Sequence, residues 1–184
     1  MDKCILPKKT STGKLVGKKW VWEPQEWLFC RKCKMYHGTR HIPDTFWKRK
    51  WENDPKKGTA GVILTRKNGW DTEFFLVQCY GNFYSFPKGK VECGETYRQA
   101  AQRELREETG IRDSLENCVE FRQSVGEHKR ISLYHMRLDK DVKINVPRDN
   151  CEVTGYGWVS SRKIRKLRLN KVTSSFLDMW YRFN

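Results

Sequence analysis

The sequence predicts an α+β fold, an α/β/α sandwich built around a mixed sheet, and three observations lead to this prediction. Short runs rich in Val, Ile and Phe recur between turn signals through the middle of the chain. One strongly capped helical stretch interrupts these runs, and a second helical stretch ends the chain. The order strands, helix, strands, helix is typical of a sheet with helices packed against it.

The expected strands are short and follow one another through the middle of the chain. Asn68-Gly69 is a turn signal between the first two, Pro87 ends the third, and a turn near Gly126 joins the fourth and fifth. The six candidate strands are residues 60–65, 73–80, 82–86, 118–125, 130–138 and 152–160.

The first helix is expected over residues 96–109. Thr96 with Gln99 makes a capping-box pattern at its start, and Gly110 stands where a C-terminal cap belongs. Residues 161–183 are expected to be helical as well, with a break near Asn170.

A chain of 184 residues is enough for one ordinary domain with a small appendage. Residues 1–19 hold six Lys and one Asp, and we expect them to form a flexible basic tail. Residues 20–57 are rich in Trp, Cys and His and are expected to form a small compact element. A turn-rich stretch at residues 53–58 separates this element from the main domain, residues 58–184.

The net charge of +15 predicts a polyanionic partner, and nucleic acid is the commonest one. The alternative is a solvated surface that only keeps the protein soluble, but the charge is uneven. One segment near the C-terminus carries six cations with no acid between them: Arg162, Lys163, Arg165, Lys166, Arg168 and Lys171. We expect this segment to bind phosphate groups.

The composition also bears on the compartment. No apolar run approaches the ~20 residues that span a bilayer, so no membrane partner is expected. The Lys-rich N-terminus lacks the apolar segment of a secretory signal. Seven scattered cysteines do not suggest a disulfide scaffold. A cytoplasmic location is therefore expected, with the nucleus as the alternative.

Three carboxylates on the first helix indicate a metal site. With 3.6 residues per turn, Glu104, Glu107 and Glu108 share one side with Ala100 and Ala101, so the acids continue the apolar stripe. Clustered inward carboxylates repel one another unless a cation lies among them. Hard oxygen ligands of this charge suit Mg²⁺ or Mn²⁺. The alternative, a solvated Glu/Arg face, does not explain why the acids extend the apolar side.

The spacing around this helix resembles the Nudix box at every defining position. The matching pattern is Gly89, five residues, Glu95, seven residues, Arg103-Glu104-Leu105, one residue, Glu107-Glu108, one residue, Gly110-Ile111. The resemblance implies the Nudix fold, with a mixed β-sheet and a catalytic loop-helix-loop. It also implies a hydrolase that cleaves a nucleoside diphosphate linked to another group.

The resemblance further implies a role for each residue of the box. Glu104, Glu107 and Glu108 would bind Mg²⁺ or Mn²⁺ with help from the Gly89 carbonyl. The metals would neutralise the bridging phosphates and lower the pKa of the attacking water. Glu95 would pair with Arg103 and hold the loop onto the helix.

The residues before the box resemble the catalytic subunit of eukaryotic mRNA decapping enzymes and their relatives in large DNA viruses. The resemblance rests mainly on Phe86-Pro87-Lys88-Gly89-Lys90. Lys88 and Lys90 would place two cations beside the phosphate chain of the substrate. Their alternative role is solvated loop charge.

A second likeness to decapping enzymes lies outside the box. Those enzymes carry a Glu six residues before a Trp-aromatic pair, and here Glu152 lies six residues before Trp158, although Val159 replaces the aromatic. The likeness makes Glu152 the candidate general base, the alternative being an exposed strand Glu. The basic segment Arg162–Lys171 lies where those enzymes carry an RNA-binding helix.

The first 57 residues depart from the decapping family, whose helical N-terminal regulatory domain is not recognisable here. In that family the domain contributes a Trp to cap recognition, and a cationic methylated guanine stacks well on indole. Trp20, Trp22, Trp47 and Trp51 are candidates for that role or for a core. Separately, Cys30, Cys33, His37 and His41 have a tight spacing that could hold a structural Zn²⁺.

The expected activity is therefore removal of the 5′ cap from RNA, which gives a capped nucleoside diphosphate and 5′-monophosphate RNA. A first alternative is a Nudix hydrolase of dinucleoside polyphosphates, inositol pyrophosphates or nucleotide sugars. A second is an RNA-binding protein with a degenerate Nudix domain, although such proteins usually lose the metal carboxylates that are intact here.

Overall fold

The computed structural model describes residues 58–78, 82–92, 94–125, 129–139, 142–147 and 152–183, and the backbone of four short strands nearer the N-terminus. Those four strands are β1 Lys14–Val16, β2 Lys19–Val21, β3 Trp27–Cys30 and β4 Met35–Gly38. Among the described residues, no helix has the length and apolar character needed to cross a bilayer.

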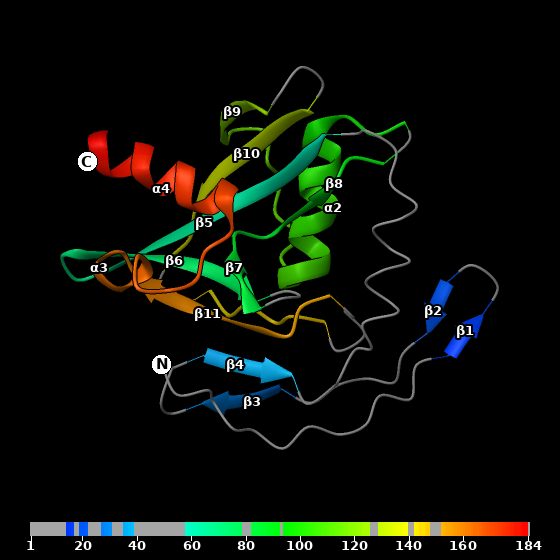
Figure 1. Cartoon of the computed structure of the whole chain (residues 1–184), viewed down its shortest axis with the longest axis horizontal. Coiled ribbons are helices and arrows are strands. Elements are labelled where there is room, and N and C mark those ends of the chain that lie inside the picture. The colour runs from blue at the N-terminus through cyan, green and yellow to red at the C-terminus, as the bar shows by residue number, and fades with distance from the viewer. Residues whose placement is uncertain are drawn as a thin grey trace.

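One large mixed sheet organises the domain (Figure 1). Its neighbouring strands follow the order β3-β4-β11-β6-β5-β10-β9, with β7 beside β6 and β8 beside β5. The pair β10–β5 is parallel and the other pairs are antiparallel. The strands of the main domain are β5 Thr59–Asn68, β6 Asp71–Gln78, β7 Tyr84–Ser85, β8 Lys88–Lys90, β9 Val119–Val125, β10 Lys129–Arg137 and β11 Gly155–Ser160.

Two apolar clusters lie on opposite faces of this sheet. Successive residues of β5 alternate between them, since Val62 belongs to one cluster and Ile63 to the other. The first cluster contains Ala101 and Leu105 of helix α2, Tyr97–Thr109, and the second receives α4, Lys171–Phe183. Helices therefore cover both faces, which confirms the predicted α+β sandwich (Figure 1).

The ends of the helices follow local rules. Thr96 and Gln99 form the predicted reciprocal capping box, and Gly110 closes α2 with a φ of 76°. The C-terminal helical stretch divides into α3, Ser161–Ile164, and α4. Asn170 accounts for the division, because its side-chain oxygen accepts the backbone N–H of Thr173, 2.9 Å away, as a cap does.

The predicted strands exist, but several of their bounds differ. The last one begins at Gly155 rather than at residue 152, so Glu152 lies in a bend before β11 and not on a strand. The third is shorter than expected because Phe86 and Pro87 leave the sheet before β8, which was not predicted. The backbone N–H of Val62 instead donates to the Pro87 carbonyl, 2.8 Å away.

The N-terminal region adds strands that sequence patterns did not predict. β1 and β2 pair with each other, and the predicted division between residues 19 and 20 falls within β2. β3 pairs with β4, and β4 pairs with β11, where His37 lies opposite Gly155. The N-terminal element thus extends the sheet of the main domain, and the three-part division of the chain stays a prediction.

The turn between β5 and β6 is as short as a hairpin allows. Asn68 pairs with Asp71, so Gly69 and Trp70 alone form the loop. Gly69 has a φ of 60°, and Trp70 is not among the described residues with positive φ. A glycine with positive φ at the first central position is the signature of a type II′ turn, which confirms the turn expected at Asn68-Gly69.

Glu120 on β9 gives the fold an acid-sensitive contact. Its carboxylate accepts hydrogen bonds from Arg122 and Arg130, at 2.8 and 2.9 Å. These contacts, that with Arg122 foremost, lower the pKa of Glu120 to about 2 in the folded protein. An acid whose pKa falls on folding stabilises the fold above its unfolded pKa, and this stabilisation is lost as the pH drops through the folded value.

We therefore expect the wild-type protein to lose more unfolding free energy between pH 5 and pH 2 than the Glu120→Gln variant. Urea unfolding at a series of pH values measures this difference. Parallel pH profiles for the two proteins would contradict the prediction.

Candidate functional site

The carboxylates of α2 occupy two environments. Glu104 and Glu108 are buried, whereas the Glu107 side chain is 54% exposed. The prediction that all three acids extend the inward stripe is therefore wrong for Glu107. At 3.6 residues per turn, Glu107 lies about 60° from Glu104, on the side away from Glu108 and Leu105.

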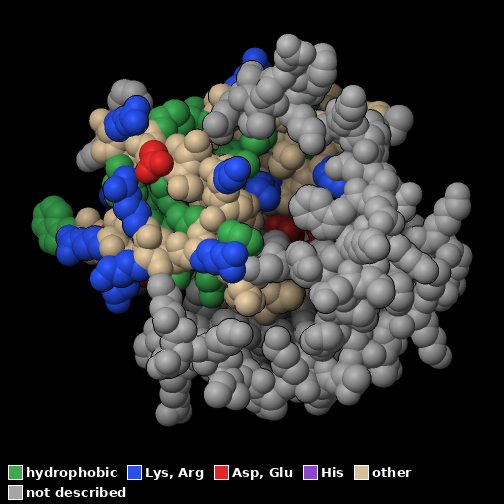
Figure 2. Space-filling view, in the orientation of Figure 1, with side chains coloured by type: hydrophobic (Ala, Val, Ile, Leu, Met, Phe, Trp, Pro, Cys, Tyr) green, Lys and Arg blue, Asp and Glu red, His purple; other side chains and the backbone are tan. Residues whose placement is uncertain are grey.

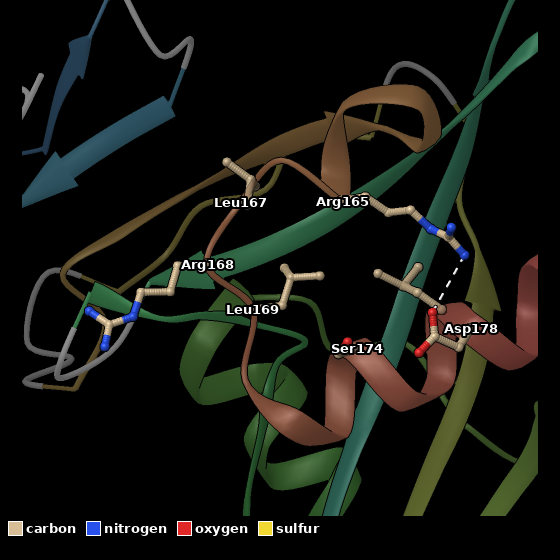
Figure 3. A pocket seen from close by; sticks show the side chains of 7 residues that line it. Arg165, Leu167, Arg168, Leu169, Ser174 and Asp178 are labelled. Carbon is tan, nitrogen blue, oxygen red and sulfur yellow. Dashed lines mark hydrogen bonds and ion pairs between the residues drawn. The ribbon is translucent and has the colours of Figure 1, made fainter. Parts of the chain in front are cut away.

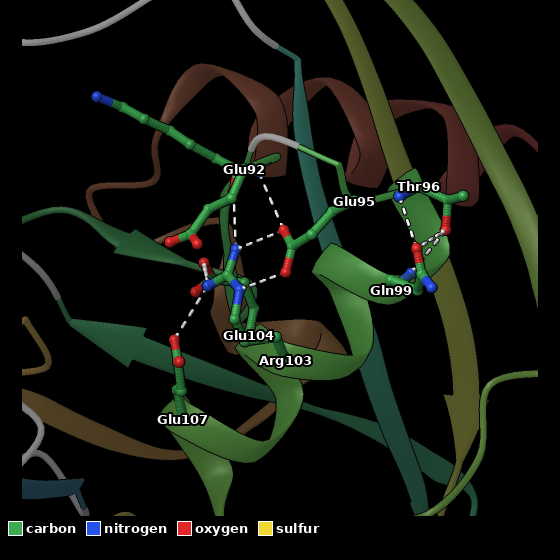
Figure 4. A network of polar contacts seen from close by, with 8 residues as sticks. Glu92, Glu95, Thr96, Gln99, Arg103, Glu104 and Glu107 are labelled. Carbon is green, nitrogen blue, oxygen red and sulfur yellow. Dashed lines mark hydrogen bonds and ion pairs between the residues drawn. The ribbon is translucent and has the colours of Figure 1, made fainter.

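Arg103 ties the helix to the loop that precedes it (Figure 4). Its Nε donates to Glu95 Oε1 at 2.9 Å, and its Nη2 donates to the Lys90 carbonyl at 2.8 Å. Its Nη1 donates to Glu104 at 2.7 Å and to Glu107 at 3.1 Å. The hydrogen bond with Glu95 is the main reason why the pKa of Arg103 is raised, so this cation is held in its charged form. The predicted pairing of Glu95 with Arg103 is present.

Strand β8 brings backbone groups directly against the two buried acids. The Lys88 N–H donates to Glu108 Oε2 at 3.0 Å. Gly89 faces Glu104, and a Cβ on this glycine would lie 2.0 Å from Glu104 Oε1. Only a residue without a side chain allows this approach, which explains the glycine at this position of the box.

The two buried carboxylates have strongly perturbed ionisation. Burial raises the pKa of Glu104 to about 7, although Arg103 opposes this effect. Burial, and then the charge of Glu104, raises the pKa of Glu108 well above its ordinary value. The Glu152 carboxylate raises both pKa values further. Glu152 therefore lies close to the α2 acids, although it precedes β11 in the chain.

These observations fit a divalent cation. Two buried carboxylates that repel each other are stabilised by a positive ion, and a carbonyl-bearing glycine lies against one of them. Glu107 is turned toward Arg103, and within the described ranges no three His, Cys, Asp or Glu side chains converge on one point. A shared metal site would thus require Glu107 to leave Arg103.

The remaining predicted substrate contacts divide into two groups. Lys88 lies beside the acids, and its positive charge lowers the pKa of Glu108 against the effect of burial. Lys90 contributes its carbonyl to Arg103. Arg162, Lys163, Arg165 and Lys166 are exposed at α3 and just beyond it. Figure 2 shows Lys and Arg side chains gathered over the region where α3 and the β5–β6 turn lie in Figure 1.

Two arginines beyond α3 are held by aromatic rings. The Arg165 guanidinium lies 4.2 Å from the centre of the Tyr181 ring and 3.4 Å from Asp178, and that of Arg168 lies 4.1 Å from the Phe83 ring. Both arginines line an open hollow of about 420 Å³ (Figure 3). Its other lining residues are Leu167, Leu169, Ser174, Leu177 and Asp178.

The candidate zinc ligands lie outside what can be tested. Cys33 and His41 are not among the described residues, and for Cys30 and His37 only the backbone is described. The candidate cap-stacking residues Trp20, Trp22, Trp47 and Trp51 are in the same position. The zinc site and the cap contact stay predictions.

Sequence patterns missed one exposed aromatic, Trp70, whose side chain is 99% exposed at the tip of the β5–β6 turn. A signal for it was present, because an indole directly after a turn-forming Asn-Gly pair has no strand face to occupy. The stacking of Arg168 on Phe83 had no such signal, since the two residues lie 85 positions apart.

Comparison with known proteins identifies the domain. The NUDIX domain model matches residues 55–179. A Caenorhabditis elegans protein named as a nudix hydrolase is 30% identical over 61% of this chain, and the match spans 30% of that protein's length. Hydrolase 111R of Invertebrate iridescent virus 3, assigned by name only, is 29% identical over 66% of this chain and 69% of its own.

Solved structures share the fold. The Caenorhabditis elegans Ap4A hydrolase matches with a TM-score of 0.52 at 25% identity, over 69% of this chain and 97% of that one. The NUDIX domain of Shewanella oneidensis NrtR, complexed with ADP ribose, matches with a TM-score of 0.57 at 12% identity, over 78% of this chain and all of that one.

Proposed function

The chain belongs to the NUDIX family, and on that premise we propose that it removes the 5′ cap from RNA. The reaction would hydrolyse the cap pyrophosphate linkage, releasing a capped nucleoside diphosphate and leaving RNA with a 5′-monophosphate. One observation carries this proposal beyond the general family activity. A run of exposed cations directly follows β11, whose other end adjoins Glu152 and the α2 acids.

The residues of the site have distinct roles in this proposal. Glu104, Glu107 and Glu108, with the Gly89 carbonyl, would hold Mg²⁺ or Mn²⁺, which when bound neutralises phosphate charge and lowers the pKa of the attacking water. Glu152 takes the proton of that water. Lys88 and Lys90 attract the phosphate chain from β8. Arg103 positions Glu95, Glu104 and the loop rather than contacting substrate.

A curated relative supports an RNA substrate. The RNA pyrophosphohydrolase of Edwardsiella ictaluri is 27% identical to this chain, and the match spans 59% of this chain and 71% of that enzyme. The Caenorhabditis elegans Ap4A hydrolase favours a second candidate, a dinucleoside polyphosphate. The exposed cations separate the candidates, because a small dinucleotide does not need a long phosphate-binding surface whereas an RNA chain does.

The deciding experiment offers the purified protein both substrates with Mn²⁺. RNA labelled in the cap phosphates should release a labelled capped nucleoside diphosphate, and the RNA product should become sensitive to an exonuclease that requires a 5′-monophosphate. Hydrolysis of diadenosine tetraphosphate with no turnover of capped RNA would establish the second candidate instead.

We expect charge reversal at Lys163 and Lys166 to weaken RNA binding. Both side chains are exposed, whereas Arg165 is engaged by Tyr181 and Asp178, so reversal of Arg165 would also disturb α4. If each lysine contacts one phosphate of a single strand, the slope of log K against log salt should fall by about 0.7 per contact. Titrations at several salt concentrations measure this slope. An unchanged slope would place the RNA elsewhere.

A further inference from the structure

The tip of the β5–β6 hairpin presents a tryptophan that the fold does not use. Trp70 is 99% exposed, whereas the next most exposed large apolar residue among those described, Val119, is 62% exposed. The two-residue loop allows little freedom, since Asn68 and Asp71 pair on either side of Gly69-Trp70. An indole held on a rigid turn with both faces in solvent is available to stack on a flat ligand.

The hairpin tip is fastened to the basic segment. The hydroxyl of Ser161 donates to Asp71 Oδ1 at 2.6 Å, and the hydroxyl of Ser160 donates to Asp71 Oδ2. These two serines end β11 and begin α3. Because Asp71 directly follows Trp70, this contact sets the indole beside the start of the cationic segment.

Cations lie on both sides of this junction. Arg162 is close enough to Asp71 to contribute to its lowered pKa, after the two serine hydrogen bonds. Lys163 is exposed on α3, and Lys67 is exposed on β5, where its Nζ donates to Thr72 Oγ1 at 3.1 Å. In Figure 2 a hydrophobic group projects beyond the Lys and Arg side chains gathered in this region.

We propose that Trp70 is a stacking platform for an unpaired base of single-stranded RNA, with Lys67, Arg162 and Lys163 holding the neighbouring phosphates. An aromatic ring beside a positively charged track is how proteins bind single-stranded nucleic acid without reading its sequence. The inference rests on the proposed function, because it assigns the RNA portion of the same substrate.

The position of the platform makes its effect depend on RNA length. Glu152 and Ser160 are eight residues apart, so the backbone between them spans at most about 28 Å. At about 3.4 Å per nucleotide, a stacked strand of about eight nucleotides covers that length. A dinucleotide bound at the α2 acids is too short to reach Trp70.

The test measures binding rather than turnover, so it is independent of decapping. Fluorescence anisotropy would give the Kd of a 12-nucleotide single-stranded RNA for wild type, Trp70→Ala, Trp70→Phe and the control Val119→Ala, an exposed apolar residue on β9. We expect Trp70→Ala to raise this Kd about ten-fold, the loss of one stacked base. Trp70→Phe should retain most of the affinity, and Val119→Ala should match wild type.

Further substrates complete the test. A 12-base-pair duplex RNA and a dinucleotide should each bind wild type and Trp70→Ala equally, because neither offers an unpaired base to the indole. Unchanged binding of the single strand by Trp70→Ala would overturn the proposal, as would an equal loss for the duplex. Loss of binding to anionic phospholipid vesicles, with RNA binding unchanged, would assign Trp70 to a membrane surface instead. A protein that binds RNA through Trp70 but leaves capped RNA intact would refute decapping alone.

Discussion

Glu108→Gln should reduce hydrolysis at saturating Mn²⁺ by at least about a hundred-fold, the scale expected when a preorganised charge at a reacting phosphate is removed. The substitution preserves shape, and the Gln carbonyl can still accept the Lys88 N–H. Because burial and Glu104 disfavour the ionised form of Glu108, the neutral side chain should leave the metal-free fold as stable or make it more stable.

The measurements are kcat/KM on capped RNA and the melting temperature with and without metal. Wild type should gain thermal stability from Mn²⁺ and Glu108→Gln should gain little, because a ligand stabilises only the state that binds it. Glu116→Gln, the same change at an exposed position, serves as the control. Glu107→Gln should also lose turnover by orders of magnitude. Near-normal hydrolysis by either box variant would show that the metal site is wrongly assigned.

Glu152→Gln is expected to lower turnover by about 10² to 10⁴, the usual contribution of a positioned general base. The box acids would be engaged with metal, so the proton of the attacking water needs another acceptor. Glu152 is close enough to raise the pKa values of Glu104 and Glu108, although it comes from the other side of the sheet order. RNA binding should stay nearly normal, since it depends on the exposed cations.

The pH–rate profile distinguishes a base from a structural residue. With metal saturating, the acid limb of the profile should flatten in Glu152→Gln while RNA affinity is retained. Asp149→Asn is the control, because Asp149 is the nearest other acid before it in sequence. Loss of turnover in Asp149→Asn alone would mean that the likeness to decapping enzymes is shifted by three residues. If neither variant matters, a box glutamate is the base.

Local chemistry made much of the site predictable. The capping box, the Gly110 cap and the spacing of the acids all depend on residues within a few helical turns, so Thr96, Gly110 and Glu104 are where the sequence implies. The exposure of Glu107 was not predictable from spacing alone, because the width of the buried stripe depends on what packs against it. Here Leu105 and Thr109, not Glu107, complete that stripe.

Long-range pairing was beyond sequence reasoning. Nothing near His37 indicates that β4 adds to the sheet opposite Gly155, 118 positions later. The start of β11 three residues after Glu152 likewise depends on its pairing with β6, where Gly155 meets Gln78. Trp70 was missed because a turn signal predicts the backbone of Gly69 but carries no information about what the next side chain will face.

The parallel pairing of β5 with β10 has a consequence for how this chain folds. Thr59 meets Ile131 across that pair, so one edge of the most buried strand has no partner until 72 further residues have been made. At the ribosomal rate of about 5 to 20 residues per second, that wait lasts on the order of 4 to 14 s. Contacts of such separation also slow folding. A nascent chain of this protein therefore exposes an apolar strand edge for seconds, and its dependence on chaperones should exceed that of a helical domain of equal size.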